Sequence, residues 1–192
     1  MIFESYPWKS ELRRHLGHFE TWGDRSHTER GGFYIERGVF LSAFIVRKLM
    51  ENRKVTDAIR SRSVRCVAYP AFRPLSDRVS RFFGVFDPNR EYDISKGRKV
   101  QISTYDLMSE IMHSYVFIPI VDDNGRWTAF LVNSYNKRDD RLLEISRADF
   151  ERVLKEVVDD NVVEVSVHKH PVSGKIHATV SGQAQKRRAR DG

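Results

Sequence analysis

Hydrophobic residues recur at helical spacing in the first third of the chain. Leu12, Leu16 and Phe19 form an apolar stripe that predicts a helix over about residues 10–22. A longer helix is expected over residues 28–53, where apolar residues leave little polar surface and so indicate a buried central helix. Thr56 and the residue after it predict the start of a short helix that runs through Arg62.

The later part of the chain alternates between strand-like and helix-like patterns. Ser103 and Ser146 are typical N-cap residues, and a helix is expected after each of them. A further short helix is expected from Ser76 to Gly84. The strands are expected at Val64–Tyr69, around Val100 and Ile102, at Tyr115–Val121, at Arg126–Asn133, at Leu142–Ile145, and in a last hairpin of residues 162–168 and 175–180.

The hairpin around Asn124-Gly125 is the clearest local feature. Asn-Gly between two apolar runs favours a two-residue loop, which would place Ile118 opposite Leu131. Both faces of this hairpin are apolar, so we expect it to lie centrally in the sheet. Pro119 cannot donate to a ladder and therefore indicates that its own strand is locally an edge or a bulge.

Together these elements predict an α+β fold in which N-terminal helices precede a mostly antiparallel sheet with packed helices. We expect a single domain over residues 1–182, helical over about 1–62 and sheet-rich over about 63–182. Residues 183–192 are expected to form a disordered basic tail.

Composition excludes several classes of protein. Cys66 is the one cysteine of the 192 residues, which excludes an internal disulfide and a cysteine-based zinc cluster and favours a reducing compartment such as the cytoplasm. No apolar run is long enough for a membrane span, and the first residues do not have the pattern of a secretory signal. The phosphate-loop, Rossmann, hydrolase-elbow and zincin motifs do not occur, which disfavours those enzymes.

The net charge of +7 is concentrated in two places. Residues 47–65 hold seven basic and two acidic residues, and the tail adds a second basic run. Clustered cations of this kind are suited to a phosphate backbone, although a solvated helix end would also account for them. The candidate nucleic-acid contacts are Arg47, Lys48, Arg53, Lys54, Arg60, Arg62, Arg65, Lys186, Arg187 and Arg188.

Three histidines gather in the last expected hairpin. If Ser173-Gly174 forms a two-residue loop, His170 faces His177, and His168 lies on the same face opposite Thr179. Three imidazoles on one face can bind zinc or a similar divalent metal, whereas a polar strand face that is rich in histidine by chance is the alternative.

Two weaker patterns suggest catalysis. Arg13 and His18 are separated by four residues, a spacing that resembles the Arg-x4-His signature of HEPN ribonucleases. The resemblance covers about six residues and implies metal-independent RNA cleavage by a toxin or defence enzyme; the sheet-rich second half departs from the family's helical bundle.

His113 follows Glu110 by one helical turn, and such a pair can perform acid–base chemistry or simply join a helix end to its neighbour.

The helix end Arg47-Lys48-Leu49 and the junction at residues 111–114 resemble small proteins common in bacterial genomes, and this resemblance implies no function. The sequence favours a cytoplasmic, non-catalytic accessory or interaction protein that contacts RNA or DNA through the basic segment and tail, without a cofactor or a membrane. A protein partner, the HEPN-like ribonuclease and the histidine metal site are the alternatives.

Overall fold

One antiparallel sheet of five strands organises the protein. In the computed structural model its strand order is β2-β1-β5-β4-β3. The structure describes residues 4–23, 28–72, 87–169, 173–174 and 176–182. The sheet is built from β1 (Ser63–Pro70), β2 (Arg98–Ser103), β3 (Ser114–Val121), β4 (Trp127–Ser134) and β5 (Arg141–Ser146).

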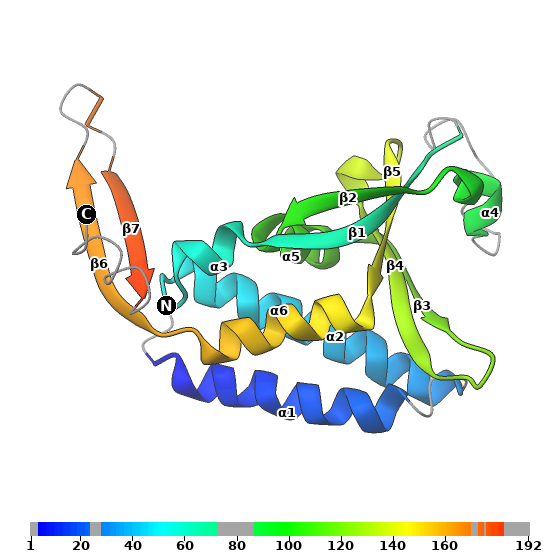
Figure 1. The fold of residues 1–192 in the computed structure, drawn as a ribbon, viewed down its shortest axis with the longest axis horizontal. Coiled ribbons are helices and arrows are strands. Elements are labelled where there is room, and N and C mark those ends of the chain that lie inside the picture. Colours follow the sequence, from blue (N-terminus) through cyan, green and yellow to red (C-terminus); the bar gives the residue numbers. More distant parts are fainter. Residues whose placement is uncertain (1–3, 24–27, 73–86, 170–172, 175, 183–192) are drawn as a thin grey trace.

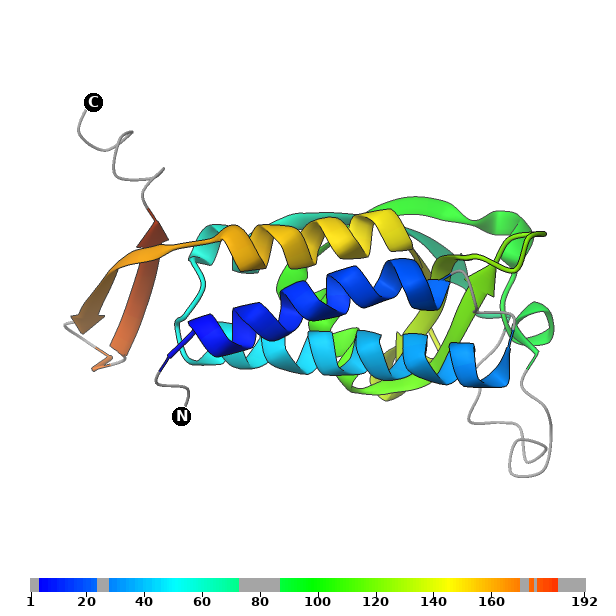
Figure 2. The ribbon, with the colours of Figure 1, turned by 90° about the horizontal axis from the view of Figure 1, so that it is seen from below.

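Helices cover one face of this sheet (Figure 1). Seen from below, α1 lies between α2 and α6 (Figure 2), and α5 packs against α2 and β4. The bounds are α1 (Tyr6–Gly23), α2 (Glu29–Glu51), α3 (Asp57–Ser61), α4 (Pro88–Glu91), α5 (Thr104–Met112) and α6 (Arg147–Asp159), with 3-10 turns η3 (Ile94–Lys96) and η4 (Tyr135–Lys137). The α+β prediction is therefore confirmed.

The predicted caps begin their helices as expected. The Thr56 hydroxyl accepts a hydrogen bond from the N–H of Ile59 at the start of α3. Ser103 accepts from the N–H of Asp106 at 3.0 Å at the start of α5. Ser146 likewise caps α6. These short polar side chains satisfy N–H groups that have no acceptor within the helix, which is why the chain enters each helix at these residues.

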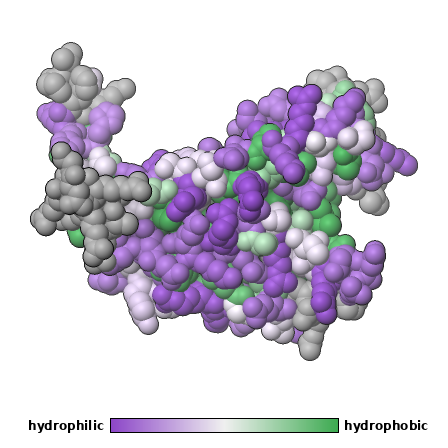
Figure 3. Space-filling model, in the orientation of Figure 1, coloured by the Kyte–Doolittle hydropathy of each residue, from purple (hydrophilic) through white to green (hydrophobic). Residues whose placement is uncertain are grey.

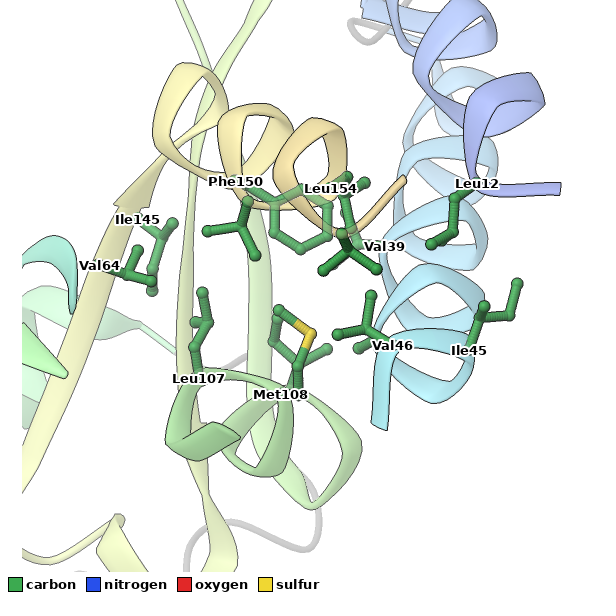
Figure 4. Packing of buried hydrophobic residues seen from close by; sticks show 14 of the residues in the cluster. Leu12, Val39, Ile45, Val46, Val64, Leu107, Met108, Ile145, Phe150 and Leu154 are labelled. Atoms are coloured by element: carbon green, nitrogen blue, oxygen red, sulfur yellow. The ribbon is translucent and has the colours of Figure 1, made fainter. Parts of the chain in front are cut away.

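The main core lies between the helices and the covered face of the sheet (Figure 4). Phe150 and Leu154 of α6 point into it together with Leu107 of α5. The rings of Phe130 and Phe150 meet edge to face with centroids 5.5 Å apart. Burial of one such side chain stabilises the fold by about 1.5–3 kcal/mol.

The long helix α2 supplies ten residues to the buried interior, among them Ile35, Val39 and Val46. Large apolar residues on its opposite side reach solvent, and Phe33 has 56% of its surface accessible. The three glycines of the predicted helix are accommodated within α2.

The β3–β4 hairpin has the predicted register, with Ile118 opposite Leu131. Its loop is one residue longer than predicted, because a bulge near Trp127 shifts the last pair of the ladder, Val121 with Trp127. Gly125 in this loop takes a positive φ of 72°. The prediction of a central position was wrong for β3, which is an edge strand, as Pro119 indicated. Both hairpin faces are apolar because the uncovered side of the sheet carries a second cluster of its own, composed of Tyr92, Val116, Leu131 and Leu142.

The last hairpin, β6 (Val162–Lys169) and β7 (Ile176–Gly182), is a separate two-stranded ribbon that extends away from the helices (Figure 1). The N–H of Val180 donates to the Asp57 carboxylate at 2.8 Å and ties the ribbon to α3.

The helix expected from Ser76 to Gly84 and the tail lie outside the described residues. The face shown in Figure 3 is mainly hydrophilic, with small apolar areas between polar ones. Among the helices that the structure describes, none is long and apolar enough to cross a membrane.

Candidate functional site

The junction of α3 and β1 brings basic residues to one end of the molecule. Asp160, just after α6, accepts hydrogen bonds from the Thr56 N–H at 2.7 Å and the Thr56 hydroxyl at 2.9 Å. At the other end of α3, the carbonyl of Arg62 accepts from the N–H of Thr104 at 2.8 Å. The short helix is thus fixed between α6 and α5, and the chain leaves it directly into β1.

A shallow depression of about 770 Å³ opens beside this junction. Arg62 and Arg65 line it from the α3–β1 segment, and Arg152 reaches it from α6. The remaining lining is small or polar: Ala58, Ser61, Ser63 and Gln101. Three guanidinium groups therefore face one open, polar surface together with hydroxyl and amide groups.

Two carboxylates of α6 hold these three arginines in place. Arg62 pairs with Glu156 at 3.0 Å, and Arg152 bridges both carboxylates, with Asp149 at 2.9 Å and Glu156 at 3.3 Å. Arg65 completes the chain of charges by pairing with Asp149 at 3.3 Å. Partial burial raises the pKa of Asp149, but hydrogen bonds from Arg152, Ser146 and Arg65 outweigh this effect and bring the pKa below its ordinary value. With three arginines and two carboxylates, the group has a formal excess of one positive charge.

A second group of cations converges on Tyr105 of α5. The guanidinium carbons of Arg47 and Arg60 lie 3.7 and 4.3 Å from the centroid of the Tyr105 ring. Arg47 also pairs with Glu51 at 3.0 Å and donates to the hydroxyl groups of Tyr105 and Ser109. Its side chain is only 16% exposed, so its contacts serve the packing of α2 on α5.

The predicted basic segment is therefore divided in space. Arg62 and Arg65 line the depression, whereas Arg47 and Arg60 stack on Tyr105. Arg53 is exposed in the α2–α3 turn at a positive φ of 58°. Two further predicted contacts lie near these groups: Lys48 pairs with Glu51 at 2.8 Å, and Lys54 is half-buried. The predicted tail residues Lys186, Arg187 and Arg188 lie outside the described residues.

Five of the seven lining residues were not predicted from the sequence, and two of them, Arg152 and Gln101, come from other elements than the α3–β1 segment. Arg152 lies on the polar side of the helix that Ser146 begins, and Gln101 is paired with Arg65 across β1 and β2. Both are far along the chain from Arg62. The alternation of β2 was the available signal for Gln101, because it sets the exposed side of that strand.

The histidines of the ribbon take a different register from the predicted one. His168 lies directly opposite His177, not opposite Thr179, so the two strands are paired two residues away from the predicted register. Both histidines are exposed, and His170 lies outside the described residues. Within the described part of the chain, no group of three histidine, cysteine or acidic side chains could hold a metal ion. The three-histidine metal site stays a prediction.

The two candidate catalytic patterns lie on separate elements. Arg13 is exposed and His18 half-buried on α1. The buried histidine of that helix is His15, whose Nδ1 lies 2.9 Å from the Ser42 hydroxyl and whose Nε2 lies 3.2 Å from Glu11. Burial lowers the pKa of His15, which favours its neutral form between α1 and α2.

The carboxylate predicted to act with His113 has another partner. Glu110 is buried, and its carboxylate accepts from the N–H of Ser134 at 2.7 Å. It also lies 3.7 Å from the Arg141 guanidinium. His113 is exposed and caps α5 through its backbone. Glu110 therefore anchors β4 to α5, and the acid–base role of His113 stays a prediction.

No protein-family model, curated protein or solved structure matches this chain.

Proposed function

We propose that this is a non-catalytic, cytoplasmic nucleic-acid-binding protein and that phosphate groups of RNA or DNA occupy the depression lined by Arg62, Arg65 and Arg152. The observation that carries the proposal is the gathering of three guanidinium groups on one open polar surface. Arginine, serine and glutamine side chains are the usual partners of nucleic-acid phosphates. The buried Cys66, whose pKa burial raises, suits a compartment where thiols stay reduced.

The ion pairs of the depression leave room for such contacts. Each guanidinium has five N–H donors, and Arg62 and Arg65 each engage their carboxylate through one nitrogen. The remaining donors can reach a phosphate while Asp149 and Glu156 keep the side chains oriented. The excess positive charge favours an anion, and its modest size favours weak, salt-dependent binding.

Fluorescence anisotropy with labelled RNA and DNA tests the proposal. The variant R62Q/R65Q/R152Q removes the three guanidinium groups, and the matched control R90Q/K96Q/R126Q removes three exposed charges elsewhere. Each phosphate contact contributes about 0.7–0.9 to the slope of log affinity against log salt, so we expect the first variant to lower the slope by about 2–3. The control should change it by less than about 1.

Two results would overturn the proposal. One is the absence of binding to either nucleic acid at about 50 mM salt, where phosphate contacts are strongest. The other is an equal loss of affinity in the depression variant and the control. Gel analysis of the same RNA separates binding from the HEPN-like alternative, which requires cleavage that His18→Ala abolishes.

A further inference from the structure

Two exposed tyrosines and an arginine form a second surface, at the end of β4. Tyr135 and Tyr115 have 59% and 42% of their surface accessible, and their rings meet edge to face at 5.9 Å. The guanidinium carbon of Arg138 lies 3.7 Å from the centroid of Tyr135 and 5.7 Å from that of Tyr115. We call Tyr115, Tyr135 and Arg138 the tyrosine platform.

Hydrogen bonds hold the backbone of the platform in place. The Tyr135 N–H donates to the carbonyl of His113 at 3.0 Å, and the preceding N–H, that of Ser134, donates to buried Glu110. Arg138 donates to the carbonyl of Tyr135 at 2.6 Å and is itself only 17% exposed. The backbone that carries the Tyr135 ring is thus set before any ligand arrives, which lowers the entropy cost of binding.

The shape and chemistry of the platform fit a flat aromatic ligand. Arg138 covers one face of the Tyr135 ring, yet 59% of the residue's surface is accessible, which leaves room for a flat ligand beside the ring. Aromatic rings backed by arginine are the surfaces on which unpaired nucleobases stack. In a duplex the bases are already stacked on one another and are not available to such a ring.

We propose that the tyrosine platform stacks an unpaired base, so that the protein prefers single-stranded nucleic acid to a duplex. This inference rests on the proposed function, because it names the class of nucleic acid that the arginine depression would bind by its phosphates. Tyr135 provides the stacking ring, Tyr115 packs against it in a T-shaped pair, and Arg138 covers one of its faces.

Anisotropy with three labelled RNA probes of about 12 nucleotides tests the platform: a mixed-sequence single strand, an abasic strand of the same backbone, and a duplex. We expect the mixed single strand to bind most tightly. Tyr135→Leu should weaken its binding about 5- to 100-fold and leave the abasic strand unchanged, because stacking of one base is lost. Tyr135→Phe keeps the ring and should stay within about 2-fold of the original protein.

Tyr6→Leu is the matched control, since Tyr6 is an exposed tyrosine on α1, and Tyr115→Leu is a second variant of the platform. Unchanged single-strand affinity in both platform variants would overturn the inference, as would an equal loss for the abasic strand. If R62Q/R65Q/R152Q weakens every probe while the platform variants change none, the proposed function stands and the platform falls. If no probe binds, both fall.

Discussion

Replacing Asp160 with alanine removes the carboxylate that joins the end of α6 to the start of α3. Its two oxygens accept from the backbone N–H and the hydroxyl of Thr56, which is only 3% exposed. Hydrogen bonds to a charged group contribute about 1.5–3 kcal/mol each, and a buried donor left without an acceptor costs about 1–3 kcal/mol. Because the two bonds share one carboxylate, we expect the free energy of unfolding to fall by about 2–4 kcal/mol.

Urea unfolding followed by circular dichroism measures this loss as a lower midpoint with an unchanged slope. Asp159→Ala is the matched control, because Asp159 is the exposed neighbour at the end of α6. In the double variant with Thr56→Val, the two effects should fall short of additivity by about 0.5–3 kcal/mol. The reasoning is refuted if Asp160→Ala and Asp159→Ala lower stability equally, or if Asp160→Ala and Thr56→Val are additive.

Three further changes probe the packing. Burial lowers the pKa of His15 from 6.5, so its stabilising effect is complete above pH 6.5 and is lost as the pH falls through the folded pKa. Urea midpoints at about pH 7 and 5.5 should therefore show a loss of stability at the lower pH, and His15→Gln should remove this loss. Equal losses of stability in both proteins would contradict the prediction. Phe150→Ala should cost about 3–5 kcal/mol in urea, because the ring is fully buried, and a cost below about 1 kcal/mol would contradict this. Gly182→Ala would place a Cβ 2.9 Å from the carbonyl oxygen of Asn161, so we expect a loss of about 1–3 kcal/mol; an unchanged melting temperature would argue against this clash.

The sequence predicted those features that local chemistry decides. The helices begin at Ser103 and Ser146 because a hydroxyl must accept the first free N–H groups, and that requirement is visible within four residues. The pairing of Ile118 with Leu131 followed from the Asn124-Gly125 turn, because a tight turn sets the register of the two strands that it joins.

The rest depends on contacts between distant residues. Arg152 joins Arg62 only because α6 packs beside β1, and no local pattern encodes that approach. The register of the histidines failed because it depended on the loop length, which alternation alone does not fix. Glu110 was paired in sequence with His113, but its buried carboxylate accepts the N–H of Ser134 on a neighbouring strand.

The separation of the β6–β7 ribbon from the main sheet has a consequence for cooperativity. A lone pair of strands is barely stable in water, and outer residues such as Val167 and Ile176 expose more than half of their surface. The ribbon can therefore open while the five-stranded sheet stays folded. Amide hydrogens of β6 should then exchange with solvent through this local opening, orders of magnitude faster than those of β4, whose protection reports global unfolding.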